Sequence, residues 1–133
     1  GNMALLALCE ELGLASVNRG PLGMGLLTGK FAPDSKFKDD DVRKHANWHP
    51  GFQNGRPTQA WLDALEAIRE VLTSDGRTLA QGALAWIWGR SEKTIPIPGF
   101  KTVKQVEQNC QAMQFGPLTL DQMGEIDRIL GRA

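Results

Sequence analysis

Residues 14–30 read Leu-Ala-Ser-Val-Asn-Arg-Gly-Pro-Leu-Gly-Met-Gly-Leu-Leu-Thr-Gly-Lys, a short strand-like run that passes into a turn rich in glycine. The run 14–18 predicts a β-strand, and Gly13 before it fits the end of a helix. That helix is predicted at 3–12 because its apolar residues recur at helical spacing, at Leu5, Leu8, Cys9 and Leu12. A helix, a strand and a glycine-rich turn in this order favour an α/β architecture.

A second strand and turn follow within residues 94–109. The run Thr94-Ile95-Pro96-Ile97 is short and rich in β-branched residues, and it ends at Pro98-Gly99, which predicts a strand followed by a turn. Helical segments separate this strand from the first, so we expect the two strands to pair in parallel through a right-handed crossover. Because parallel sheets are normally covered on both faces, two such strands indicate a slice of a larger sheet.

Four further segments show the period of helices, at 59–72, 79–88, 103–113 and 119–130. The segment 79–88 is apolar on nearly every side, which predicts burial on more than one side. The other three have one apolar stripe each, formed by Trp61, Leu65, Ile68 and Leu72, by Val103, Val106, Cys110 and Met113, and by Leu120, Met123, Ile126 and Leu130. Capping boxes predict three helix starts, at Thr78 with Gln81, at Thr102 with Gln105, and at Thr119 with Gln122.

The charge balance and the lack of long apolar runs narrow the function classes. Lysine plus arginine and aspartate plus glutamate number 15 each in the 133 residues, so we expect no nucleic-acid binding, which needs a basic excess. No apolar run approaches the ~20 residues of a membrane span, and the first residues show no basic region followed by an apolar core, so we expect no secretion. We therefore expect a cytoplasmic chain without membrane contact, in which Cys9 and Cys110 are free thiols.

Residues 31–57 show no sustained period and are rich in Asp, Lys, Pro, Gly, Asn and His. We interpret them as a lid-like loop inside a single partial domain, residues 1–133, since loops of this length in a compact domain are usually functional or disordered. His45 and His49 lie four residues apart there, but no third ligand follows at a convincing spacing, so no metal site is expected. The run Asp39-Asp40-Asp41 predicts a solvated loop or the start of a helix.

The two turns are the candidate binding sites. Glycines directly after a strand let the backbone approach an anion closely, although the spacing in 18–30 also fits a flexible turn. At the second turn a helix begins near Val103, and a helix N-terminus favours a phosphate. The polar face of that helix fits either a phosphate site or a merely solvated surface, and it carries Lys101, Lys104, Gln105 and Gln108.

Taken together, the two turns resemble the aldo/keto reductase family. Residues 19–30 are similar to the aromatic-Ser-Pro-Leu-x-x-Gly-Leu-Leu-Thr-Gly-Lys pattern after the family's seventh barrel strand, and 97–109 to its Ile-Pro-Gly-x-Lys segment, which ends in Glu-Asn after the eighth. The Thr-Leu-Ala-Gln-x-Ala-Leu-Ala-Trp stretch at 78–86 and the Leu-x-x-x-Gln-Met-x-Glu-Ile-Asp stretch at 118–127 extend the resemblance. It implies an α/β, helix-rich fold: the C-terminal portion of a (β/α)8 TIM barrel, with two parallel strands and flanking helices.

The resemblance implies NADP as the cofactor. The pyrophosphate and the nicotinamide ribose would be lined by the first turn, at Gly20, Pro21, Leu22, Gly23 and Met24. Lys30 and Arg43 would reach the pyrophosphate from the lid, and Gly99, Lys101 and Gln105 would surround the 2′-phosphate and adenosine. Asn109 would bind the adenine edge. Among the departures from the family pattern, Arg19 replaces an aromatic residue that stacks on the nicotinamide, and Gln108 replaces a glutamate.

The family's catalytic Asp, Tyr, Lys and His are carried by the first half of the barrel, and none of their motifs occurs here, so no catalytic residue is assigned. Tyrosine is absent from the sequence altogether. The resemblance thus implies the cofactor-binding part of an NADP-dependent oxidoreductase that reduces a small aldehyde or ketone, inactive without the N-terminal half of the barrel. Self-association is the other expected partnership. A redox-sensing regulatory module and an inactive truncated fragment are the alternative functions.

Overall fold

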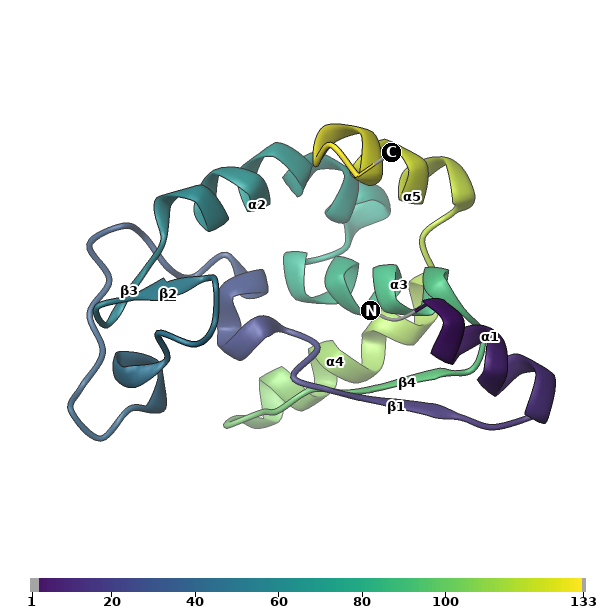
Figure 1. Ribbon diagram of the computed structural model, residues 1–133, viewed down its shortest axis with the longest axis horizontal. Helices are drawn as coiled ribbons and strands as arrows, with labels where there is room; N and C mark the ends of the chain where they lie inside the picture. The colour runs from purple at the N-terminus through teal and green to yellow at the C-terminus, as the bar shows by residue number, and fades with distance from the viewer. Residues whose placement is uncertain (1–2, 133) are drawn as a thin grey trace.

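Two short parallel strands, β1 (Ser16–Arg19) and β4 (Thr94–Ile97), form the base on which the helices are arranged (Figure 1). The computed structural model describes residues 3–132. The remaining elements in chain order are α1 (Met3–Leu12), the 3-10 turns η1 (Gly23–Thr28) and η2 (Val42–His45), the strands β2 (Phe52–Gln53) and β3 (Arg56–Pro57), α2 (Gln59–Leu72), η3 (Ser74–Gly76), α3 (Leu79–Arg90), α4 (Val103–Phe115) and α5 (Leu120–Ile129).

The predicted parallel pairing is confirmed, with a register that runs from Ser16 opposite Thr94 to Arg19 opposite Ile97. The first strand begins two residues later than predicted, because the Leu14 N–H donates back to the Cys9 carbonyl at 2.8 Å and so still belongs to the end of α1. Since both strands end at the same edge of the sheet, the turns that follow them leave from that same edge.

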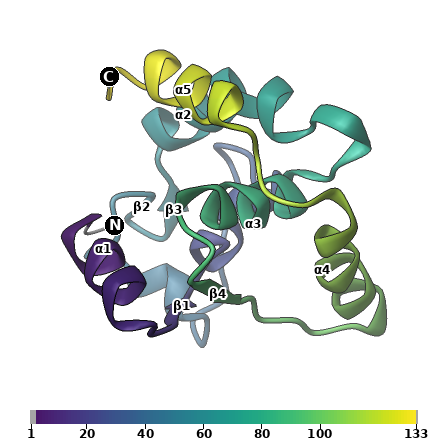
Figure 2. The same ribbon diagram turned by 90° about the vertical axis from the view of Figure 1, so that its right-hand side faces the viewer.

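The helices form two layers over one face of this sheet. In both views α3 lies between the strands and an outer pair, α2 and α5 (Figures 1 and 2), and Figure 2 shows α1 and α4 on opposite sides of α3. No helix among residues 3–132 is long and apolar enough to cross a membrane.

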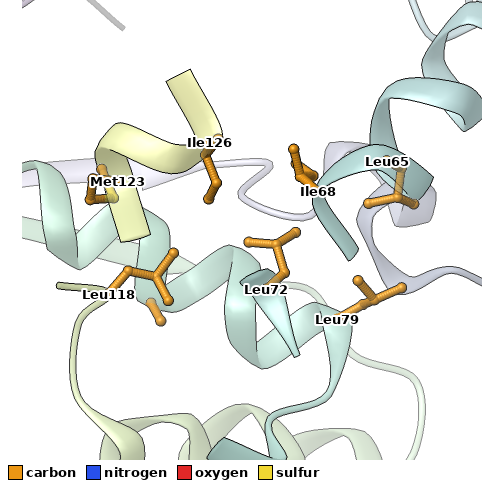
Figure 3. Close-up of a cluster of buried hydrophobic side chains, with 8 residues drawn as sticks. Leu65, Ile68, Leu72, Leu79, Leu118, Met123 and Ile126 are labelled. Carbon is orange, nitrogen blue, oxygen red and sulfur yellow. The ribbon is translucent and has the colours of Figure 1, made fainter. Parts of the chain in front are cut away.

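The main core joins α2, α3 and α5 (Figure 3). The predicted stripe of α2 is confirmed, since Leu65, Ile68 and Leu72 are buried. The expected burial of the 79–88 segment on more than one side is also confirmed, because five successive residues of α3, 81–85, are buried. The cluster consists of Leu65, Ile68, Leu72, Leu79, Ala85, Leu118, Met123 and Ile126.

Helix α4 departs from the prediction, because its predicted apolar stripe faces outward. Val103 is 74% and Met113 72% exposed, and the buried residue of this helix is Ala112. Polar contacts from α3 and the turn before it hold α4 in place instead: the Gln81 side-chain amide donates to the Gln108 carbonyl at 2.9 Å, and Arg77 donates to the Phe115 carbonyl at 3.1 Å.

Other helix faces also differ from the predicted stripes. In α1 the buried residues are Leu6 and Cys9, whereas Leu8 and Leu12 are exposed, and in α5 Leu120 is exposed. The capping boxes at the starts of α3 and α5 are confirmed. The capping box predicted at Thr102 and Gln105 is only half correct. Thr102 accepts from the Gln105 N–H as predicted, but the Gln105 side chain accepts from the N–H of Lys101.

The segment 31–57 has more structure than an irregular loop. It contains η2 and a β2–β3 hairpin, whose turn uses positive φ at Asn54 (50°) and Gly55 (69°), as a tight hairpin requires. A second, smaller core fixes it against η1, formed by Leu26, Ala46 and Phe52 with Met24, Phe31, Phe37 and Trp61 packed on it. This segment, which we continue to call the lid, is therefore an ordered excursion.

Candidate functional site

The site begins at the turn after β1, which curls tightly because four of its residues adopt left-handed backbone angles: Gly20, Gly23, Met24 and Gly25. The N–H groups of Gly23 and Gly25 donate within the turn, to Gly20 and Leu22, at 3.0 Å each. These glycines therefore serve to close the turn, and their own N–H groups are not turned outward to an anion.

Met24 is the unusual member of this turn. Its φ of 54° is a conformation that non-glycine residues rarely adopt and that costs on the order of 1 kcal/mol or more. The Met24 carbonyl accepts a hydrogen bond from Arg43 at 3.4 Å, and its side chain packs on the lid core. Contacts between the turn and the lid thus hold this strained backbone.

Arg43 joins the lid to the turn. Its Nε and Nη2 donate to the two carboxylate oxygens of Asp41, at 2.8 and 2.5 Å, and its guanidinium lies 5.3 and 4.7 Å from the ring centroids of Phe31 and Phe37. The hydrogen bond from Arg43 holds the pKa of Asp41 far below its usual range, and Asp41 in turn raises the pKa of Arg43. This ion pair lies beside the turn and is connected to it through the Met24 carbonyl.

Lys30 and Lys101 add two further cations. The Lys30 Nζ lies 3.2 Å from where a side chain on Gly25 would begin, and 5.1 Å from the centre of the Phe31 ring. Partial burial lowers the pKa of Lys30, and the charges of Arg43 and Lys101 lower it further against the opposing effect of Asp41. Lys30 and Arg43 therefore lie against the same aromatic ring, that of Phe31, where the first turn meets the lid.

The second turn leads from β4 into α4. Thr102 caps the helix, and the Lys101 N–H donates to the Gln105 side-chain oxygen at 2.6 Å, which closes the turn. Gly99 is exposed, and a side chain there would meet nothing within 4 Å. Gln108 and Asn109 lie one turn further along α4, half-buried.

The fold brings most of the predicted residues to one edge. Arg19 ends β1 and is exposed, like Val17 on the same face of the strand. The first-turn residues, Lys30, Arg43 and Lys101 gather at the carboxyl edge of the sheet, whereas Gln108 and Asn109 lie along α4. Sequence reasoning missed the role of Asp41 as the partner of Arg43, although it did allow a helix start there, and Asp41 caps η2.

The histidines of the lid have separate contacts. The His45 ring lies 3.3 Å from the Asp39 carbonyl, and the His49 ring accepts a hydrogen bond from the Gly51 N–H at 3.0 Å. Within residues 3–132 there is no group of three or more His, Cys, Asp or Glu side chains placed to hold a metal ion.

Comparison with known proteins gives a consistent result. A model of the aldo/keto reductase family matches residues 2–131. Aldo-keto reductase str7 of Strobilurus tenacellus is 31% identical over 127 residues, covering 96% of this chain and 36% of that protein. Aldo-keto reductase yakc of Schizosaccharomyces pombe, whose name includes NADP(+), is 30% identical over 112 residues, covering 84% and 32%.

A solved structure is also similar. The glycerol dehydrogenase of Gluconobacter oxydans superposes with a TM-score of 0.77 at 28% identity, over 96% of this chain and 37% of that chain. The chain spans about a third of the length of these relatives, 32% and 36% of the two reductases. Its parallel strands and flanking helices are accordingly a portion of a (β/α)8 barrel.

Proposed function

Because this chain belongs to the aldo/keto reductase family, we propose that it forms the NADP-binding part of an oxidoreductase that reduces aldehydes or ketones to alcohols. The observation that carries this proposal is that both turns leave the carboxyl edge of the parallel strands, where Lys30 and Arg43 flank the ring of Phe31 and Lys101 follows β4. In barrels of this kind, ligands bind at that edge.

The residues present fit a cofactor with several phosphates. Partial burial lowers the pKa of Lys30, the charges of Arg43 and Lys101 lower it further, and an anion bound beside Lys30 would relieve that repulsion. Asp41 is already engaged by Arg43 and orients it. The bound cofactor supplies the hydride for reduction of the carbonyl, and the chain's share is to bind and orient it.

We assign two groups of residues to the cofactor. The pyrophosphate and nicotinamide side would be held by the first turn and the lid, namely Arg19, Gly20, Pro21, Leu22, Gly23, Met24, Lys30 and Arg43. The 2′-phosphate and adenosine would be held at the second turn and α4, by Gly99, Lys101, Gln105, Gln108 and Asn109. Lys101 beside the N-terminus of α4 is the group that favours NADP over NAD, because a phosphate gains from both the lysine and the helix end.

The proton for the reduction has to come from outside these residues. No tyrosine occurs among the 133 residues, so we propose that the catalytic acid belongs to other units of the barrel and that the isolated chain does not turn over. Those units, or a second copy of the chain, would cover the exposed sheet face. We place the protein in the cytoplasm, where thiols such as Cys9 and Cys110 stay reduced.

Fluorescence titration of the purified chain with NADPH tests the binding half of this proposal. We expect an enhanced nicotinamide signal that 2′,5′-ADP abolishes at lower concentration than 5′-ADP does. Equal competition by the two nucleotides would contradict a 2′-phosphate site. For the catalytic half, oxidation of NADPH with 4-nitrobenzaldehyde is expected to stay at the level of a heat-denatured control, and turnover above it would refute the proposed inactivity.

A further inference from the structure

A cavity of about 460 Å³ lies between α2, α3, the end of α5 and the first turn. Its volume falls within the range of about 300–1,000 Å³ that is typical of sites for small molecules. Ala64 on α2 and Ala83 on α3 line it, and their short side chains leave the space open. Leu65 and Ile68, which belong to the main core and are labelled in Figure 3, form part of its wall. The cavity is therefore an apolar space set against the core.

Two tryptophans make the lining aromatic. Trp61 on α2 and Trp86 on α3 both line the cavity, and both are half-buried. The Trp61 ring lies 5.5 Å from the His49 ring, and the Arg90 guanidinium lies 5.0 Å from the Trp86 ring, so each indole is packed against a neighbour. Because aromatic rings pair favourably in offset or edge-to-face arrangements, this lining favours an aromatic ligand.

Arg132 is the charged residue among the described residues that line the cavity. Helix α5 ends in a turn that reverses the chain, with Gly131 in the left-handed conformation at a φ of 63°. In this turn the Arg132 N–H donates to the Asp127 carbonyl at 2.8 Å, which brings Arg132 back to the helix end beside the cavity. Within residues 3–132 no carboxylate lies within ion-pair distance of the Arg132 guanidinium. An unneutralised cation therefore lies at the edge of an apolar space.

We propose that this cavity binds a small aromatic carboxylate, whose rings pack on Trp61 and Trp86 and whose carboxylate pairs with Arg132. The Thr58 hydroxyl also lines the cavity, but it already donates to a backbone carbonyl at 3.1 Å, so Arg132 is the side chain that orients the ligand. The site goes beyond cofactor binding, because of the described lining residues only Pro21 is also assigned to the cofactor.

The two parts of the ligand contribute differently. Most of the affinity comes from the apolar contacts, since they remove ring surface from water. Arg132 is exposed, and an exposed ion pair contributes a factor of about two to five in affinity. The charge therefore decides which aromatic compound binds best, and the cavity decides whether one binds at all.

The probe is 2-naphthoate, and 2-naphthamide, which has the same rings without the charge, is the matched control. Each is titrated into the nitrogen-15-labelled chain while NMR follows the indole N–H signals, which are assigned with single Trp→Phe variants. We expect the signals of Trp61 and Trp86 to shift, and that of Trp88 to stay, because Trp88 does not line the cavity. Naphthoate is expected to bind about two- to fivefold more tightly than naphthamide. Equal affinities, or an equal shift at Trp88, would overturn the assignment.

Two pairs of variants complete the test. Arg132→Gln is expected to remove the preference for naphthoate, whereas Arg128→Gln should keep it, since Arg128 is paired with Glu125 and does not line the cavity. Ala64→Leu fills part of the cavity and is expected to weaken both ligands by about tenfold. Ala67→Leu, at an exposed position of the same helix outside the cavity, should leave both unchanged. A preference that survives Arg132→Gln would refute the pairing, even if Ala64→Leu fails to fold.

NADPH separates this proposal from that of the cofactor site. Naphthoate that still binds in the presence of saturating NADPH supports a second site, and displacement by NADPH would show that the probe occupies the cofactor position. A chain that binds naphthoate with the expected indole shifts but does not bind NADPH contradicts the proposed cofactor site alone.

Discussion

Lys101 lies beside the N-terminus of α4, where a phosphate would meet both its charge and the helix dipole. Replacing it with alanine is expected to weaken NADPH binding by about tenfold or more and to leave NADH binding nearly unchanged, since a charge-assisted hydrogen bond contributes about 1.5–3 kcal/mol. Titration of both cofactors measures this. Lys93→Ala is the control, because Lys93 is an exposed lysine just before β4. Equal losses for the two cofactors would show that Lys101 does not contact the 2′-phosphate.

Asp41 gives a prediction in pH. Its folded pKa is depressed by Arg43, so its contribution to the free energy of unfolding is complete above the unfolded pKa of about 3.9 and is lost as the pH falls below that value. Asp41→Asn is expected to lower the thermal midpoint at pH 7, and the difference from the unchanged chain is expected to shrink progressively at acid pH. Asp40→Asn, at an exposed neighbouring position, serves as the control. A difference that is constant with pH would mean that the carboxylate charge is not what stabilises the lid.

The pairing of Asp41 with Arg43 is a detail of the site that the sequence did not predict. Arg43 was identified only through a family resemblance, because its contact with the Met24 carbonyl spans 19 residues of chain and leaves no local pattern. The strained backbone of Met24 was not predicted either, since methionine is not a residue typical of turns. Such details arise from the packing of the lid on the turn, which no spacing of residues encodes.

Among the elements, the contact of α2 with α3 depends on one small residue. A Cβ on Gly82 would lie 2.0 Å from the Leu72 carbonyl oxygen, a backbone atom that cannot move aside cheaply. Gly82→Ala is therefore expected to destabilise the chain by about 1–3 kcal/mol, the usual cost of overpacking. Gly124→Ala in α5 is the matched control, because nothing lies within 4 Å there, and it should stabilise the helix by about 0.5–1 kcal/mol. Thermal or urea unfolding measures both; a stabilising Gly82→Ala would show that the helices can separate freely.

Periodicity located every helix but not every buried face. It succeeded for α2, whose stripe packs against α3 and α5, because those partners lie within the chain. It failed for α4 and for part of α1, where apolar residues such as Val103, Met113 and Leu8 are exposed. We infer that the apolar residues exposed on α4 and α1 would pack against the other units of the barrel, which these residues do not include.

At the scale of the whole molecule, too, some features were predicted from the sequence and others were not. The parallel pairing and the order of elements followed from the sequence, because both depend on local patterns and on general rules of chain connection. The site at the carboxyl edge followed from the family resemblance, and the inter-segment contacts that shape it did not. At this scale the sequence predicted most directly that the two strands are a slice of a larger sheet, since one face of the sheet would have no cover.

The uncovered face yields the last prediction. Val17, Ile95 and Ile97 on the two strands are 62%, 48% and 51% exposed, and strands with unpaired edges and apolar faces are normally covered or closed. We expect the isolated chain to self-associate, or to bind the N-terminal half of the barrel when that is supplied, and size-exclusion chromatography with light scattering measures this. Val17→Lys should weaken the association, because it puts a charge on the sheet face, whereas Val42→Lys should not, since Val42 lies on the lid at a similar 64% exposure. A monodisperse species with the mass of one chain and a cooperative thermal transition would show instead that two strands and their helices suffice for a stable fold.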